Sequence, residues 1–309
     1  MEYIKGITFA PFAHRGVLAS KEARHSLELL HKRTGADHVL LAPTGVQETP
    51  YSEHIDFSAD YLPQDDELID SIRFAQSLGL KVILKPTVNC ANGVWRAYIN
   101  FFDTEVPGEP QWSRWYAAHE RFQLHYAALA EKTGCVMFIM GCEMVMAERR
   151  EAHWRDLAAK IKALYHGPLS YNTDKYQEDQ VRWWDCVDNI SSSGYYPSGS
   201  WDRQLDRIEK VVRHFDKPFF FAETGCMSAV GAAQEPNNWR CVGAADPGEQ
   251  ERWYEEMFER TVRRSWIQGT VLWDWPPALY PEEEAHAHTG YAIYAKPAEA
   301  VVRRYYAQR

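Results

Sequence analysis

The amino-acid sequence predicts an α/β protein in which eight parallel strands and their helices close into a single (β/α)8 barrel, the TIM-barrel class. Eight short runs of apolar or β-branched residues recur along the chain, and each but the last is clearly followed by a helical pattern. Segments entering these runs are short and several leaving them are long, as expected where the loops after the strands build the functional face. The chain has 309 residues, 45% of them hydrophobic, and no linker divides it, so we interpret residues 1–309 as one domain.

Ordinary start and stop signals delimit the predicted elements. Residues 65–78 form an apolar stripe with acids in the first turn, and this helix is expected to stop at Gly79. Ser200 is expected to cap a later helix, and Asp246 with Glu249 to form a capping box at the start of another. The eight predicted strands are residues 6–9, 38–41, 81–84, 137–142, 169–171, 189–191, 219–222 and 270–273.

Composition and charge exclude several classes of function. The formal net charge is −9, which disfavours nucleic-acid binding because a phosphate backbone rewards a basic face. No run approaches the roughly 20 apolar residues of a membrane span. The N-terminus shows no basic and apolar leader, so we expect a cytoplasmic protein, with export by another route left open. The six cysteines contain no C-x-x-C pair and are expected to be free thiols.

Aromatic residues gather where a ligand is expected. The chain has 12 Trp and 17 Tyr, and such rings favour half-wet clefts in which flat sugar faces can stack. The long loops after the predicted strands carry Trp95 and Trp239, which either stack on a sugar or pin their own loops. His286 and His288 alternate as a strand-borne metal pair does, yet a solvated loop is the favoured interpretation and no metal is expected.

Two glutamates stand at the ends of predicted strands four and seven. Glu143 closes the run 137–142 and Glu223 closes the run 219–222. Period-two alternation predicts that Ile139 and Gly141 share the face of Glu143, and that Phe219 and Phe221 share the face of Glu223. Either glutamate alone is equally explained as a structural ion pair, but two at these positions favour chemistry because an unpaired glutamate is rarely placed in apolar surroundings.

This pair of carboxyl groups suits glycosidic bond cleavage. One carboxyl must hold a proton while the other stays anionic, and a separation of roughly 5–5.5 Å supports the retaining mechanism. We expect Glu143 to hold the proton as general acid/base and Glu223 to attack the anomeric carbon.

At these residues the sequence resembles clan A of the glycoside hydrolases and, more closely, family 113, the β-mannanases. The resemblance covers nearly the whole chain, and its motifs are residues 5–9, 79–86, 141–143, 222–225 and 272–275. It implies a retaining enzyme without a cofactor that cleaves β-1,4-mannosidic bonds in mannan, glucomannan or manno-oligosaccharides by double displacement. It assigns acid/base and nucleophile to Glu143 and Glu223, a substrate tyrosine to Tyr195 or Tyr196, and the sugar floor to Trp273.

One position departs from the clan. Many members have Asn before the acid/base, whereas this chain has Cys142, so the hydrogen bond to the sugar 2-OH is expected from Asn172 or Asn89. Lys85 either binds sugar hydroxyls or lies solvated at the rim. The main hypothesis is an endo-acting mannanase. An exo-acting β-mannosidase or mannobiose-releasing enzyme, a hydrolase of other β-linked glycans, and a non-catalytic sugar-binding barrel stay open as alternatives.

Overall fold

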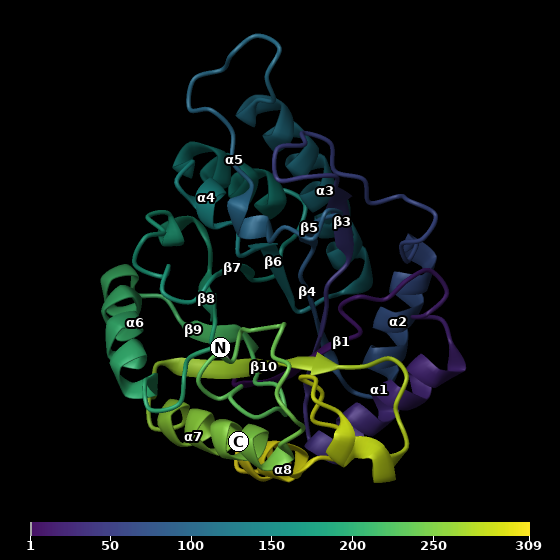
Figure 1. Cartoon of the computed structure of the whole chain (residues 1–309). Helices are drawn as coiled ribbons and strands as arrows, with labels where there is room; N and C mark the ends of the chain where they lie inside the picture. The colour runs from purple at the N-terminus through teal and green to yellow at the C-terminus, as the bar shows by residue number, and fades with distance from the viewer. Residues whose placement is uncertain (1) are drawn as a thin grey trace.

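The computed structural model describes residues 2–309, and its centre is a closed barrel of eight parallel strands (Figure 1). All eight predicted runs lie in these strands, so the predicted fold class is confirmed. The barrel closes where β1 pairs with β10, which joins the two ends of the chain. Around the barrel the strands follow in the order β1 (Ile4–Phe9), β10 (Ile267–Trp275), β9 (Phe219–Thr224), β8 (Asn189–Ser193), β7 (Leu169–Thr173), β6 (Met137–Cys142), β4 (Lys81–Leu84) and β2 (His38–Leu41).

Helices surround the barrel, with α7 and α8 side by side and α8 also against α1 (Figure 1). The α-helices are α1 (Lys21–Thr34), α2 (Asp65–Ser77), α3 (Trp112–Thr133), α4 (Val145–Glu148), α5 (Glu151–Lys162), α6 (Trp201–Phe215), α7 (Pro247–Thr261) and α8 (Pro297–Ala307). Short 3-10 turns are η1 (Arg96–Tyr98), η2 (Trp184–Cys186) and η3 (Glu282–Ala287). The segment between η1 and α3 projects from the body of the molecule (Figure 1).

Two of the predicted helix starts differ in detail from the structure. Ser200 precedes α6, but its hydroxyl donates to the Pro197 carbonyl at 2.7 Å and makes no cap bond, so the predicted side-chain cap is wrong. Asp246 does cap α7 by accepting from the Glu249 backbone N–H at 3.0 Å. The Glu249 carboxylate instead accepts from two backbone N–H groups of residues 231 and 233, so only half of the predicted capping box forms.

A small parallel sheet extends the barrel outward and was not predicted from the sequence. It pairs β3 (Thr44–Gln47) with β5 (Thr87–Cys90). Pro43 and Pro86 lack an N–H, so each interrupts its strand for a residue or two before the chain continues as this outer pair. The chain segments that follow the second and third barrel strands therefore leave the barrel as a hydrogen-bonded pair. This pairing fixes where the loop containing η1 begins.

Two apolar layers hold the barrel together. The outer layer lies between strands and helices and is rich in fully buried tryptophans, including Trp154, Trp183 and Trp253. The inner layer fills the barrel with Ile4, Leu40, Ile83, Met137, Ile139, Phe220, Ala222 and Val271. These side chains occupy the interior below the mouth, so polar groups at the mouth rest on a packed floor.

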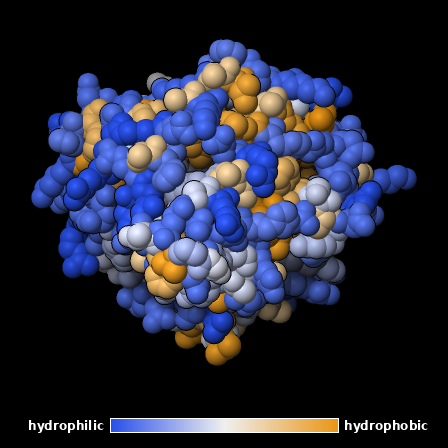
Figure 2. All heavy atoms as spheres, turned by 90° about the horizontal axis from the view of Figure 1, so that it is seen from above, coloured by the Kyte–Doolittle hydropathy of each residue, from blue (hydrophilic) through white to orange (hydrophobic). Residues whose placement is uncertain are grey.

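The surface seen from above is mainly hydrophilic, with separate apolar groups between hydrophilic residues (Figure 2). Every helix within residues 2–309 falls short of the length and apolar character that a membrane crossing requires. All six cysteines are free thiols.

Candidate active site

Both glutamates reach the mouth of the barrel because the strands that carry them are bulged. In β9 the inward residues are Phe220 and Ala222, and the pairing with β8 then shifts between Ser192 and Ser193. The shift turns Glu223 inward, as bulges at barrel rims commonly re-aim a side chain. The prediction that Phe219 and Phe221 share its face is therefore wrong, because both pack in the outer layer.

Strand β6 contains a similar bulge. Its pairing with β7 shifts between Ile139 and Cys142, and a side chain at Gly141 would meet Tyr171 and Trp154 in the outer layer. Gly141 thus faces outward, contrary to the predicted alternation, and Cys142 faces the interior. Glu143 follows with a φ of 51°, a left-handed conformation that is costly for a residue with a Cβ and is concentrated at functional sites.

Strand-borne groups surround Glu223. The ammonium of Lys85, whose side chain is 0% exposed, forms an ion pair with Oε1. The Tyr195 hydroxyl donates to Oε2 at 2.9 Å, and the Cys142 thiol lies 3.3 Å from Oε1. Burial opposes the charge of Glu223, but the cations of Lys85 and Arg96 and the Tyr195 hydrogen bond outweigh it and lower the pKa of this carboxyl. Glu223 is therefore a buried carboxylate held as an anion.

Loop-borne groups meet Glu143. The guanidinium of Arg96 and the indole N–H of Trp95 both donate to Oε2 at 3.0 Å. The Ser193 hydroxyl at the end of β8 donates to Oε1 at 2.7 Å. Arg96 is anchored in turn by donating to the Val88 carbonyl at 2.9 Å and to Asn89 Oδ1 at 2.7 Å. The small outer sheet thus carries the group that positions Glu143.

Asn172 connects the partners of Glu223 with the partners of Glu143. Its Oδ1 accepts from Lys85 at 3.1 Å, and its Nδ2 donates to the Ser193 hydroxyl at 3.0 Å. Both of its amide atoms are therefore committed beneath the mouth. A hydrogen-bonded chain consequently joins Glu223 to Glu143 through these three side chains.

The two glutamates line one cleft of about 590 Å³. Its aromatic wall contains Trp273, Trp239 and Phe12, whose ring centroids lie 5.7–5.9 Å apart with edge-to-face geometry. Trp95 lies in the loop between β5 and η1 and is 40% exposed. The residues lining the cleft are Phe12, Asn89, Cys90, Gly93, Val94, Trp95, Arg96, Glu143, Asp174, Lys175, Tyr195, Glu223, Asn237, Trp239, Arg240 and Trp273.

The structure distributes the predicted site residues over three places. Glu143, Glu223, Trp273, Tyr195, Asn89, Trp95 and Trp239 line the cleft. Lys85 and Asn172 lie just beneath it, fully buried, so the alternative of a solvated Lys85 at the rim is wrong. Tyr196 lies outside it, because its hydroxyl donates to the buried Glu178 at 2.6 Å. Of the two tyrosines suggested by the resemblance, Tyr195 is the one that meets Glu223.

Sequence reasoning missed several residues of the cleft. Arg96 is the most consequential, since it pairs with Glu143 across 47 positions of sequence. Asp174 and Lys175, which directly follow β7, also went unnoticed. Their position after a barrel strand was a usable signal, because that position faces the mouth. Arg96 offered no such signal, since it lies within a long loop.

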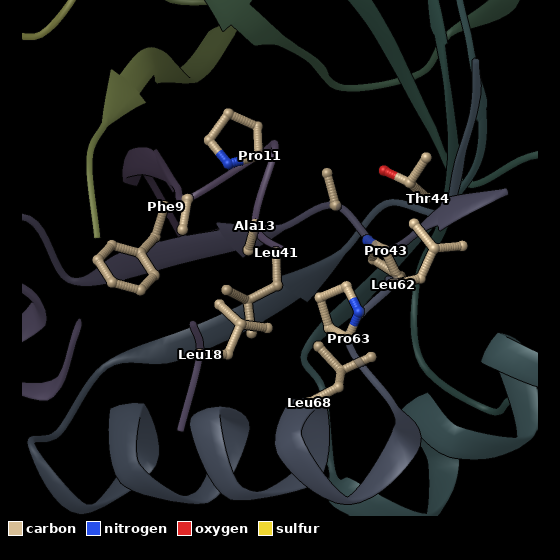
Figure 3. Close-up of a pocket in the computed structure, with 12 residues that line it drawn as sticks. Phe9, Pro11, Ala13, Leu18, Leu41, Pro43, Thr44, Leu62, Pro63 and Leu68 are labelled. Carbon is tan, nitrogen blue, oxygen red and sulfur yellow. The ribbon is translucent and has the colours of Figure 1, made fainter. Parts of the chain in front are cut away.

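A smaller hollow between β1 and β2 differs in kind (Figure 3). It measures about 20 Å³ and is lined by apolar side chains such as Phe9, Leu41 and Leu62, with Thr44 at its edge. It offers no charged or titratable side chain. Within residues 2–309, no group of three His, Cys, Asp or Glu side chains is arranged to hold a metal ion.

A (β/α)8 barrel with two glutamates at the ends of strands four and seven and an aromatic cleft between its loops defines the class of glycoside hydrolases. The model of Glycoside Hydrolase Family 113 matches residues 7–296. The chain belongs to this family, and the resemblance drawn from its sequence is confirmed.

Solved structures agree with this placement. A β-1,4-mannanase of family 113, solved as a complex, is 52% identical with a TM-score of 0.99, and the match covers 100% of both chains. A family 113 β-mannanase from Alicyclobacillus acidocaldarius in complex with ManMIm is 40% identical with a TM-score of 0.96, covering 100% of this chain and 98% of that one. A Bifidobacterium dentium β-glucuronidase, 15% identical with a TM-score of 0.66, shares the fold over 99% of this chain and 47% of its own. No curated protein sequence matches the chain.

Proposed function

We propose that this chain is an endo-acting enzyme that hydrolyses β-1,4-mannosidic bonds in mannan, glucomannan or manno-oligosaccharides with retention of configuration. The observation that carries the proposal is a single cleft lined by two buried glutamates with different partners, one held by a lysine and a tyrosine and the other by a loop arginine and tryptophan. The substrate class is taken from the two similar family 113 proteins, a β-1,4-mannanase and a β-mannanase.

In the first step Glu223 attacks the anomeric carbon of the sugar in subsite −1. A carboxylate already held as an anion by Lys85 needs no deprotonation before it attacks. Glu143 gives its proton to the glycosidic oxygen, the C1–O bond breaks, and the leaving-group sugar departs with its new hydroxyl. A glycosyl ester to Glu223 is left in the cleft.

In the second step Glu143, now a carboxylate, takes a proton from a water molecule. The resulting oxygen attacks C1 from the side that the leaving group vacated, and the ester bond to Glu223 breaks. Two inversions give net retention. Arg96 and Trp95 donate to the same oxygen of Glu143, and they stabilise its anionic form between the two steps.

Sugar recognition is assigned to the cleft walls. Trp273 is the floor for the sugar in subsite −1, and the ammonium of Lys85 lies 5.8 Å from its ring centroid. Asn89 is the better candidate for the 2-OH. Both amide atoms of Asn172 are engaged by protein groups, whereas Asn89 lines the cleft and engages Arg96 through its Oδ1, so that its Nδ2 is left to donate to the sugar. Exposed Trp239 and Trp95 stand on different loops that line the cleft and provide two further stacking surfaces for sugars, which favours endo action.

Two matched variants test the mechanism. Glu223→Ala is expected to lose at least about 10⁴-fold in kcat on mannohexaose, and azide should then restore turnover as a glycosyl azide of inverted configuration. Glu143→Ala with azide should instead give the azide of retained configuration on 2,4-dinitrophenyl β-mannobioside, because the nucleophile is intact and this leaving group departs without a proton. Near wild-type activity in either variant, or the same azide anomer from both, would contradict the assignment.

Product analysis with mannohexaose tests the mode of action. A mixed ladder of shorter oligosaccharides is expected from the wild-type protein. One small product released from a chain end would replace endo by exo action. Cleavage of cello- or galacto-oligosaccharides in preference to mannohexaose would change the substrate class, and the absence of products from every glycan would leave a sugar-binding barrel.

A further inference from the structure

Three carboxyl groups line the cleft, and the third is not used by the mechanism above. Asp174 follows β7 and is 7% exposed. Within residues 2–309 its carboxyl accepts no side-chain hydrogen bond, and the ammonium of Lys175 lies 3.8 Å away. Glu143 and Glu223, by contrast, each have three side-chain partners within hydrogen-bonding range. Asp174 is therefore a buried carboxyl group that faces the cleft and has no side-chain hydrogen bond, unlike the two glutamates.

The strand that carries Asp174 places it beside Glu143, because β7 pairs with β6 and the backbone N–H of Glu143 donates to the Asn172 carbonyl, two residues before Asp174, at 2.7 Å. The charges that act on it most strongly are those of Glu143 and Lys175, followed by Glu178. Those acting on Glu223 are Lys85 and Arg96. Asp174 thus faces the proposed acid/base rather than the nucleophile. Because the acid/base contacts the oxygen between subsites −1 and +1, a group beyond Glu143 faces the sugar that leaves.

The protonation state of Asp174 suits a hydroxyl ligand. Burial, and then the charge of Glu143, raise the pKa of Asp174 to about 8, while Lys175 acts in the opposite direction. A neutral carboxylic acid both donates and accepts a hydrogen bond, as a sugar hydroxyl does. No side chain within residues 2–309 donates a hydrogen bond to this carboxyl, so a ligand hydroxyl that does so gains affinity at this position.

We propose that Asp174 binds a hydroxyl group of the pyranose in subsite +1, on the leaving-group side of the cleaved bond. The assignment rests on the proposed function and sharpens it. It makes Asp174 a residue that selects a hydroxylated sugar over an apolar leaving group. An aryl leaving group would occupy the same place and leave the carboxyl without a partner.

The test compares two substrates that both need a proton from Glu143. Mannotetraose places a hydroxylated sugar in subsite +1, whereas 4-methoxyphenyl β-mannobioside places a poor leaving group there without such hydroxyls. Asp174→Ala is expected to lower kcat/KM on mannotetraose by about 10- to 100-fold and to change kcat/KM on the aryl substrate less than about threefold. Asp174→Asn keeps a donor and an acceptor, so its loss on mannotetraose should be smaller.

The control is Asp179→Asn on the same loop. Asp179 is exposed and pairs with Arg207 at 3.1 Å outside the cleft, so both kcat/KM values should stay at the wild-type level. Equal losses on the two substrates in Asp174→Ala would mean that Asp174 acts through Glu143 or through folding, and would overturn the assignment. Unchanged kinetics on both would overturn it as well. A wild-type protein that cleaves neither substrate is a separate result that removes the proposed function and this assignment together.

Discussion

The surroundings of Glu223 and Glu143 are built in different ways. Glu223 is held by Lys85, Tyr195 and Cys142, which are fully buried or nearly so and stand at the ends of barrel strands. Glu143 is held mainly by the loop that begins after β5, through Arg96 and the half-exposed Trp95. One carboxyl is fixed by the scaffold and the other by a segment on the surface.

The difference matches the two tasks. A nucleophile keeps one protonation state until it attacks, so rigid strand-borne partners that stabilise its anion serve it well. An acid/base loses and regains a proton in each turnover, and partners that are too strong for one state would slow one of the two steps. Loops carry adjustable contacts at lower cost than strands do. The comparison predicts that removing a partner of Glu223 costs more activity than removing the equivalent partner of Glu143.

Among the partners of the two glutamates, the largest effect is expected for Lys85→Met. Removing one partner of a buried ion pair costs about 3–5 kcal/mol, so kcat/KM on mannohexaose should fall by about 10²- to 4 × 10³-fold as Glu223 takes up a proton. The matched control is Lys81→Met at the opposite end of the same strand, where Lys81 pairs with the exposed Glu2. That variant should retain wild-type activity. Comparable losses in both variants would point to damage of β4 rather than of the nucleophile.

The Lys85→Met variant should also change the pH dependence of kcat/KM in a defined direction. Lys85 lowers the pKa of Glu223, and the enzyme is active only where Glu223 is anionic, that is, above this pKa. Removing the cation raises the pKa, so the acid limb of the kcat/KM profile should move to higher pH. An acid limb that stays in place would show that Lys85 does not control the charge of the nucleophile.

A smaller loss is expected for Tyr195→Phe. The variant removes one hydrogen bond to a buried carboxylate, which is worth about 1.5–3 kcal/mol, so kcat/KM should fall by about 10- to 100-fold. Tyr196→Phe is the control, because the Tyr196 hydroxyl donates to the buried Glu178 and not to Glu223. That variant should melt at lower temperature with kcat/KM of the folded enzyme unchanged. Reversed outcomes for the two tyrosines would exchange their roles.

The strand-borne half of the site was open to prediction from the sequence. Glu143, Glu223 and Lys85 end or directly follow apolar runs, and the parallel topology brings such positions to one rim. Tyr195 lies two residues beyond β8 in the same way. The fold followed from the same runs, since each apolar segment of suitable length became a barrel strand.

The loop-borne half and the detailed side-chain directions were not predictable by the same reasoning. Period-two alternation fails where a bulge inserts a residue, and both β6 and β9 are bulged just before their glutamates. The pairing of Arg96 with Glu143 depends on how a long loop folds back over the mouth, which no local pattern encodes. Asp174 was overlooked although its place after β7 marked it, because a single acid near a strand end is also a common surface residue.

The smallest effect, and the most direct comparison with Tyr195→Phe, is expected for Trp95→Phe. Each variant removes one neutral donor from one glutamate, at 3.0 Å for Trp95 and 2.9 Å for Tyr195. Trp95 is 40% exposed, so water can replace its N–H, and kcat/KM on mannohexaose should fall only about two- to fivefold. Tyr98→Phe is the control, because Tyr98 contacts Trp95 edge-to-face with centroids 6.1 Å apart and keeps that ring in the variant. If Trp95→Phe lost as much activity as Tyr195→Phe while Tyr98→Phe stayed unchanged, the loop would hold Glu143 as firmly as the strands hold Glu223, and the distinction between the two carboxyl groups would fail.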